Sequence, residues 1–161
     1  MDILKFSINT GFAHVGLLTG GETLTRYAKA FGFGKPTGIE LPGEGSGILF
    51  EPKDMRPIDV ATMSIGQGIA VTPLQMVQAY SAIANGGKMV KPHIIQSIKN
   101  ADGSDYKVTP VEYSGDPISK KVADDVKDMM EKEVSEAAVL MPRCLAIIWP
   151  VKPARPRNWI R

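Results

Sequence analysis

The spacing of apolar residues predicts a mostly helical body. A short helix is expected after Asn9, ending at Gly20-Gly21. A second helix follows it, with Gly32 as its expected C-cap. The apolar residues of this second helix recur at i, i+3, i+4 and i+7, which is the spacing of one helical face. They are Leu24, Tyr27, Ala28 and Phe31.

The clearest helix start in the chain is Thr72-Pro73-Leu74-Gln75. Thr72 can cap the helix, Pro73 suits the first helical position, and Gln75 completes a capping box. The helix should end at residues 85–87, and its apolar positions are Leu74, Val77, Tyr80 and Ala84. A last helix is expected to begin between residues 116 and 119, with an apolar stripe of Ile118, Val122, Val126 and Met129.

Strand and loop signals fill the remaining segments. Residues 32–52 are rich in Gly and Pro, which predicts an ordered loop with little regular structure. Two short apolar segments flank Asp102-Gly103, and this pair of residues is a hairpin turn signal. The body, residues 1–136, is therefore expected to be an α+β domain with more helix than strand.

Composition narrows the chemistry. The chain has 161 residues, of which 43% are hydrophobic, and a net charge of +2. This charge gives no case for nucleic-acid binding. One cysteine, Cys144, excludes an intrachain disulfide, and with only His14 and His93 beside it the chain offers no basis for a structural zinc site. We expect no metal and no cofactor. The chain shows no signal peptide and no apolar run long enough to span a membrane.

The average charge hides a break near residue 136. Residues 137–161 contain five basic residues and no acidic residue, whereas residues 1–136 have 14 basic and 17 acidic residues. The same 25 residues contain both tryptophans and the only cysteine. This shift predicts two parts of different origin, a body over 1–136 and an aberrant basic tail over 137–161.

Five short motifs occur in one order along the body. They are NTGF (9–12), FGFG (31–34), TGIELPGE (37–44), SIGQG (64–68) and VTPLQ (71–75). Each motif alone is weak, but the ordered set closely resembles the transpeptidase domain of class B penicillin-binding proteins. The resemblance covers about residues 2–136. It implies part of the fold shared with serine β-lactamases, namely the helical region and part of an antiparallel sheet.

The resemblance also implies candidate site residues. Enzymes of this family line one cleft with S-x-x-K, S-x-N and K-T-G motifs. Ser7-Ile8-Asn9 matches the second motif, in which the serine shuttles a proton and the asparagine binds the substrate amide. Taken without this context, Ser7 and Asn9 are equally typical of a helix N-cap. Ser64, Gly66, Gln67 and Gly68 form a loop that either supports the wall of the site or is simply a structural glycine turn.

The other two motifs are not found where the family has them. The S-x-x-K motif, whose serine is the nucleophile, is expected upstream of Ser7. Ser104-Asp105-Tyr106-Lys107 has this pattern, but it follows S-x-N and falls on the predicted hairpin turn, so we interpret it as a turn. No K-T-G occurs in the chain. One permitted set of codons for residues 137–161, read from its third nucleotide, encodes GGSNAAVPGYHLAGKTGTAEKLDS, which contains K-T-G. We therefore expect the tail to come from a frameshift.

These features lead to two expectations of function. The first is a fragment of a peptidoglycan D,D-transpeptidase, which cross-links stem peptides through an acyl-serine intermediate and is acylated by β-lactams. The fragment is expected to be inactive alone. The second is a non-catalytic binding or scaffold module of the cell-wall synthesis machinery. The resemblance implies a parent protein outside the cytoplasm, anchored to the cytoplasmic membrane.

Overall fold

The computed structural model describes residues 2–137 of the chain. Its helices are α1 (Asp2–Lys5), α2 (Asn9–Thr19), α3 (Gly21–Ala30), the 3₁₀ helix η1 (Pro52–Asp54), α4 (Pro57–Met63), α5 (Pro73–Ala84) and α6 (Lys120–Ala137). Its strands are β1 (Met89–Val90), β2 (Ser97–Lys99), β3 (Asp105–Val108) and β4 (Tyr113–Gly115). The predicted α+β class, with more helix than strand, is confirmed. Helices α1 and α4 and the 3₁₀ helix η1 were not predicted.

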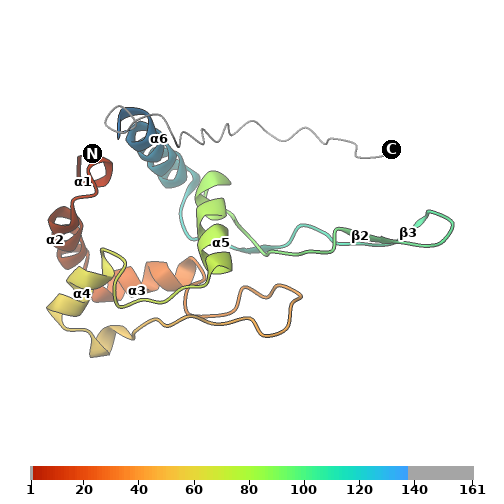
Figure 1. The fold of residues 1–161 in the computed structure, drawn as a ribbon, viewed down its shortest axis with the longest axis horizontal. Coiled ribbons are helices and arrows are strands. Elements are labelled where there is room, and N and C mark those ends of the chain that lie inside the picture. Colours follow the sequence, from red (N-terminus) through yellow and green to blue (C-terminus); the bar gives the residue numbers. More distant parts are fainter. Residues whose placement is uncertain (1, 138–161) are drawn as a thin grey trace.

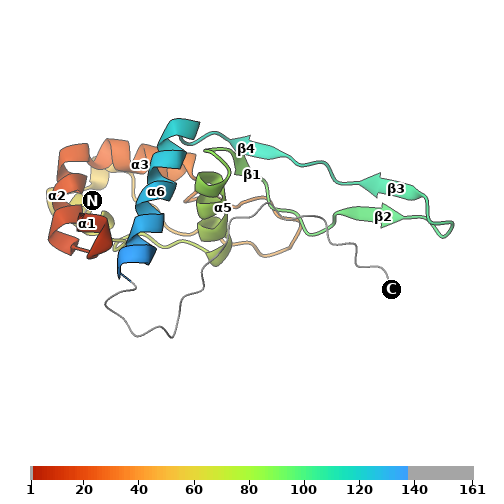
Figure 2. The same ribbon diagram turned by 90° about the horizontal axis from the view of Figure 1, so that it is seen from above.

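The helices form two groups that meet at α1. Helices α2, α3 and α4 pack against one another at one end of the molecule, and α6 contacts both α1 and α5 (Figure 1). Strands β1 and β4 lie beside α5, and the chain segments beyond them lead away from the helices, as a ribbon, to β2 and β3 at the opposite end from α2 (Figure 2). The first residue of α2 is Asn9, so the Ser7–Asn9 segment lies between the short helix α1 and the first helical group.

The ribbon consists of two short antiparallel ladders. Strand β1 pairs with β4, and β2 pairs with β3 in the register Ser97↔Val108 and Ile98↔Lys107. The predicted turn is present between β2 and β3, and Gly103 adopts the left-handed conformation there with φ +85°. Every residue of β2, β3 and β4 is exposed. The hairpin prediction is confirmed, and among the strands described here only β1 packs against the helices, with Met89 2% exposed.

Helix α5 begins as predicted. The Thr72 hydroxyl accepts a hydrogen bond from the Gln75 N–H at 3.1 Å, and the Gln75 carboxamide oxygen accepts one from the Thr72 N–H at 2.8 Å. These reciprocal bonds are the capping box that the Thr-Pro-Leu-Gln sequence predicts. The start of α5 is therefore determined locally.

The Gln75 side chain also connects α5 to the Gly- and Pro-rich loop. It is completely buried, and its amide nitrogen donates to the Lys35 carbonyl at 2.7 Å and to the Ser46 carbonyl at 2.9 Å. Gly47 comes so close that an added Cβ would lie 2.3 Å from the Ala70 carbonyl oxygen. One carboxamide thus ties both ends of the loop to the helix, with all of its polar atoms bonded.

One turn further along α5, the Gln78 side chain also connects the helix to another segment, here the paired strands β1 and β4. Its side chain is 6% exposed, and its amide nitrogen donates to the Val90 carbonyl at 2.9 Å and to the Ser114 hydroxyl at 3.3 Å. Val90 and Ser114 belong to the paired strands β1 and β4. Gln78 therefore anchors the base of the ribbon to α5.

The buried face of α5 is not the one that the apolar pattern suggested. The helix buries Gln75, Gln78, Ala79 and Ala82. Val77 is 62% exposed and Tyr80 is 53% exposed. The expected stripe of α6 differs in the same way, because Ala123 is buried while Val122 and Met129 are exposed. The inner faces of these two helices thus present small and amide side chains, although the large side chain of Met89 in β1 is also buried.

A carboxylate organises the tip of the Gly- and Pro-rich loop. Glu44 accepts hydrogen bonds from the Thr37 N–H at 2.7 Å, the Thr37 hydroxyl at 2.6 Å and the Gly38 N–H at 3.0 Å. These bonds, the Thr37 hydroxyl foremost, lower the pKa of Glu44 below its ordinary value of 4.5. Glu44 is thus a loop-ordering residue.

Replacing Gln75 by alanine should reduce the stability of the whole body. The Lys35 and Ser46 carbonyls and the Thr72 N–H all lose their partner, and the free energy of unfolding should fall by about 3 kcal/mol. Urea denaturation measures this change. Gln96→Ala, at an exposed position, is the matched control and should alter stability by less than about 0.5 kcal/mol. Equal effects of the two substitutions would contradict the anchoring function of Gln75.

Acid should loosen the loop held by Glu44. Because the pKa of Glu44 is lowered on folding, its ionised form stabilises the fold above the pKa of the unfolded chain. This contribution is lost as the pH falls from about 4.5 through the lower folded pKa. Urea denaturation at several pH values should show a shallower acid-side decline for Glu44→Gln than for the unsubstituted chain. Parallel declines would be inconsistent with the bonds described.

Candidate functional site

Ser7 occupies an unusual backbone position between α1 and α2. Its φ is +49°, which makes it the only described residue other than glycine with a positive φ. The Ser7 N–H donates to the Leu4 carbonyl at 3.1 Å, and the Ile8 N–H donates to the Ile3 carbonyl at 2.9 Å. This pair of bonds is the Schellman motif that closes a helix, with Ser7 at the left-handed position.

Two other helices end with the same motif but with glycine. In α3, Gly32 has φ +86°, and the Phe33 N–H donates to the Ala28 carbonyl at 3.0 Å. In α4, Gly66 has φ +83°, and the Gln67 N–H donates to the Thr62 carbonyl at 3.0 Å. Glycine is preferred at this position because it lacks a Cβ. Ser7 is thus strained where glycine is not, and this kind of local strain is a feature of functional sites.

Asn9 is the first residue of α2, and its side chain is exposed. The N-cap of α2 is Ile8, and no side chain caps the helix. The interpretation of Ser7 or Asn9 as a helix cap is therefore wrong. Neither side chain forms a hydrogen bond with another residue of the described part of the chain. A hydroxyl and a carboxamide, both able to donate and to accept, are free to bind a ligand at this corner.

The second half of α2 is held by α4. An added Cβ at Gly16 would lie 1.6 Å from the Ser64 hydroxyl oxygen, so only glycine allows the two helices to approach this closely. The Ser64 hydroxyl donates to the Val60 carbonyl at 2.8 Å, within its own helix end. Ser64 therefore has a packing function against α2.

The loop after Ser64 turns the chain back toward α5. Gly66 and Gly68 both have positive φ, and Gln67 is exposed. Residues 9 and 16 are separated by about 10 Å along the axis of α2 at 1.5 Å per residue. Ser64 lies against Gly16, so the structure connects the Ser64–Gly68 loop to the Ser7–Asn9 corner through α2, with no hydrogen bond between them among residues 2–137.

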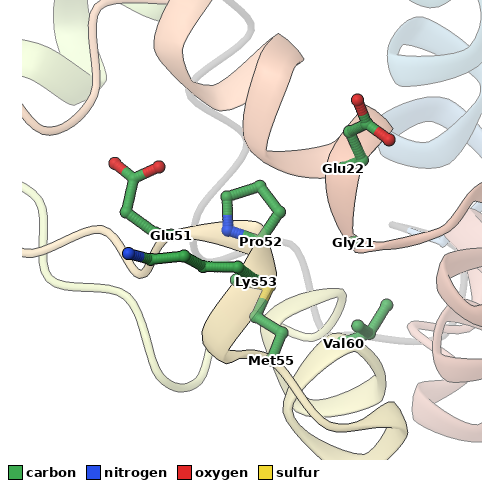
Figure 3. Close-up of a pocket in the computed structure, with 7 residues that line it drawn as sticks. All are labelled: Gly21, Glu22, Glu51, Pro52, Lys53, Met55 and Val60. Atoms are coloured by element: carbon green, nitrogen blue, oxygen red, sulfur yellow. The ribbon is translucent and has the colours of Figure 1, made fainter.

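A surface pocket lies at the other end of α2. It has a volume of about 540 Å³ and is lined by Gly21, Glu22, Glu51, Pro52, Lys53, Met55 and Val60 (Figure 3). The Lys29 ammonium bonds the Glu51 carboxylate at 2.8 Å and lowers its pKa. Helix α2 is about 16 Å long. Because the pocket lies beyond its C-terminal end, it is separate from Ser7 and Asn9.

The second S-x-x-K match is part of a turn, as interpreted above. The Ser104 hydroxyl donates to Asp102 and accepts from the Asn100 amide, which closes the turn between β2 and β3. This turn is at the far tip of the ribbon from α1 and α2 (Figure 2). The Ser104 hydroxyl is bonded within the turn to Asp102, and Lys107, the lysine of the match, lies further along the strand β3.

Residues 2–137 show neither a metal site nor a membrane-spanning helix. No group of three or more His, Cys, Asp or Glu side chains is placed to hold a metal ion in this part of the chain. Nor does any helix described here combine the length and apolar character needed to cross a membrane.

Sequence reasoning missed the residues that build the corner. Helix α1 has only four residues, too few for a periodic signal. The available signal was a pair of glycines, Gly11 and Gly16, inside a helical pattern. Glycine destabilises a helix interior, so such a residue usually has a packing reason.

The comparisons with known proteins agree with this architecture. The family model described as the penicillin binding protein transpeptidase domain matches residues 1–142. The chain belongs to this family. Stage V sporulation protein D of Bacillus subtilis is 47% identical over 94 residues, which is 58% of this chain and 15% of that protein. Peptidoglycan D,D-transpeptidase MrdA of Salmonella typhimurium is 34% identical over 123 residues, 71% of this chain and 19% of that protein.

Solved structures show the same fold. Penicillin binding protein 3 of Mycobacterium tuberculosis, complexed with aztreonam, superposes with a TM-score of 0.72 at 33% identity over 80% of this chain and 28% of that chain. A putative peptidoglycan glycosyltransferase of Atopobium parvulum superposes with a TM-score of 0.74 at 32% identity. This match covers 83% of this chain and 30% of that chain. The chain thus spans less than a third of these structures and about a sixth to a fifth of the two curated relatives named above.

Replacing Ser7 by glycine should stabilise the chain. Removal of the Cβ relieves the left-handed backbone, and the free energy of unfolding should rise by about 1 kcal/mol. Ser81→Gly is the matched control, because Ser81 is exposed within α5 and the same change there should lower stability by about 0.5 kcal/mol. Urea denaturation distinguishes the two signs. A loss of stability in Ser7→Gly would show that Ser7 is not strained.

Proposed function

We propose that Ser7 and Asn9 are the second motif of a D,D-transpeptidase site, and that the chain is part of an enzyme that cross-links peptidoglycan stem peptides. The observation that carries this proposal is the corner itself. A serine stands at a strained position where glycine is favoured, two residues before an exposed asparagine, and within residues 2–137 neither side chain is hydrogen-bonded to another residue. Membership of the transpeptidase family supports the same assignment.

In the proposed reaction, each of the three motifs has a separate function. The nucleophilic serine of S-x-x-K needs a neighbouring base because a hydroxyl is a weak nucleophile at neutral pH. The Ser7 hydroxyl relays a proton between this centre and the leaving amine, and the Asn9 carboxamide hydrogen-bonds the substrate amide. K-T-G pairs with the substrate backbone. The Ser64–Gly68 loop supports the wall of the site by holding α2 in place.

The 161-residue chain is proposed to be inactive by itself. Its only S-x-x-K match is the turn at Ser104, and it contains no K-T-G. The proposed frameshift origin of residues 137–161 accounts for the absence of K-T-G. This tail lies outside the described residues, apart from Ala137 at the end of α6. The boundary between residues 136 and 137 stays a prediction.

Ligands, partners and location follow from the same proposal. Stem peptides are the proposed substrate, and β-lactams are the proposed acylating inhibitors, since the Mycobacterium tuberculosis relative was crystallised with aztreonam and with ampicillin. The intact enzyme is proposed to act outside the cytoplasm, anchored to the cytoplasmic membrane, together with other proteins of cell-wall synthesis.

A chimera tests this function. Residues 1–136 replace the equivalent segment of Stage V sporulation protein D, whose remaining segments are expected to supply the other two motifs of the family, and acylation by fluorescent penicillin is followed over time. The chimera should be labelled. Ser7→Ala and Asn9→Ala should each slow acylation by about 100-fold or more, since each removes a group that acts at the reacting centre. Ser81→Ala, at an exposed helix position, is the control.

Two results would overturn the proposal. The first is a folded chimera in which Ser7→Ala and Asn9→Ala are acylated as fast as the control. The second is stable labelling of the unmodified 161-residue chain after denaturation, which would require a nucleophile other than the one proposed. A folded chimera that is never labelled would favour the non-catalytic scaffold module instead.

A further inference from the structure

Ile3 and Gly11 lie against each other across the turn that contains Ser7. An added Cβ at Gly11 would be 2.8 Å from Cγ1 of Ile3 and 3.0 Å from both Cγ2 and Cδ1. Ile3 is in α1 and Gly11 is in the first turn of α2. Isoleucine is branched at Cβ and has few rotamers in a helix, so it cannot swing away to make room. The contact therefore sets how closely α1 and α2 approach.

Ile3 acts on the same turn through its backbone. Its carbonyl accepts the Ile8 N–H, the outer bond of the Schellman motif, while the Leu4 carbonyl accepts the Ser7 N–H. The Ile8 carbonyl in turn accepts the Phe12 N–H, in the first turn of α2. Ile3 thus acts on the turn around Ser7 in two ways, through the backbone hydrogen bond that closes α1 and through its side-chain contact with Gly11.

We propose that Ile3 and Gly11 are positioning residues that hold Ser7 in the left-handed conformation beside Asn9. Their packed contact fixes the separation of α1 and α2, and that separation determines the path of the three residues between them. Helix α6 contacts α1 and braces it from another side. The geometric part of this inference stands alone, and its catalytic consequence rests on the proposed function.

The first test is Gly11→Ala in the full chain, observed by NMR. The added methyl group should push α1 from α2, shifting the amide resonances of Ser7 and Asn9 and changing the scalar couplings that report the sign of the Ser7 φ. Adding Ile3→Ala should restore both signals, because it removes the atoms that clash. Gly16→Ala is the matched control in the same helix, and its clash is directed at Ser64. It should leave the Ser7 couplings unchanged.

A second variant keeps the test decisive if Gly11→Ala fails to fold. Ile3→Ala alone removes the contact without adding an atom. It should speed hydrogen exchange at the Ile8 N–H, whose acceptor is the Ile3 carbonyl, more than at the Phe12 N–H. Unchanged Ser7 couplings in Gly11→Ala, no restoration by Ile3→Ala, or unchanged Ile8 exchange in Ile3→Ala would each overturn the inference.

The catalytic consequence is measured separately in the chimera. Gly11→Ala should slow acylation by about 100-fold, the effect of misplacing a reacting group by about 1 Å, and Ile3→Ala should restore most of the rate. If the Gly11→Ala chimera is acylated slowly and Ile3→Ala does not restore the rate, the proposed positioning function of Ile3 and Gly11 is refuted. An unlabelled parent chimera, with the NMR results as expected, would refute the proposed function and leave the geometric inference standing.

Discussion

The body depends on one buried carboxamide. Gln75 caps the start of its own helix and reaches both ends of the Gly- and Pro-rich loop, and no polar atom of its side chain is left without a partner. A half-satisfied amide at this depth would destabilise the fold, whereas a fully satisfied one specifies a single arrangement. Gln78 repeats the arrangement for the ribbon. Loop, helix and ribbon are therefore positioned by directional bonds more than by apolar packing.

This polar anchoring explains the orientation of α5. The amide side chains occupy the inner face, so Val77 and Tyr80 are directed outward. The same preference for close, small contacts recurs at α2, where Gly16 meets Ser64 and Gly11 meets Ile3. Glycines and short side chains let the backbones approach, and it is the contact of Gly11 with Ile3 that we propose defines the corner at Ser7. Strain at Ser7 is thus maintained by contacts made elsewhere in the fold.

Local signals predicted α2, α3, α5, α6 and the hairpin of β2 and β3, whereas α1, α4 and η1 were missed. The capping box at Thr72, the C-cap at Gly32 and the turn at Gly103 are each determined by neighbouring residues, so the sequence was sufficient. The buried face of α5 was mispredicted because apolar periodicity favours the burial of Val77 over that of Gln75. In the structure, Gln75 is buried because its side chain bonds to backbone carbonyls 29 and 40 residues away. Ser7 and Asn9 were proposed by resemblance, but the strain at Ser7 and the contact between Ile3 and Gly11 depend on α1, which has no periodic signal.

The central claim is that the Ser7–Asn9 corner is a ligand-binding site. Titration of the ¹⁵N-labelled chain with a synthetic stem peptide ending in a D,D-dipeptide tests it most directly. The amide resonances of Ser7 and Asn9, including the Asn9 side-chain amide, should shift in a saturable manner, and those of Glu22 and Lys53 at the distant pocket should not. Shifts confined to the pocket, or none at Ser7 and Asn9 at saturating peptide, would contradict this account.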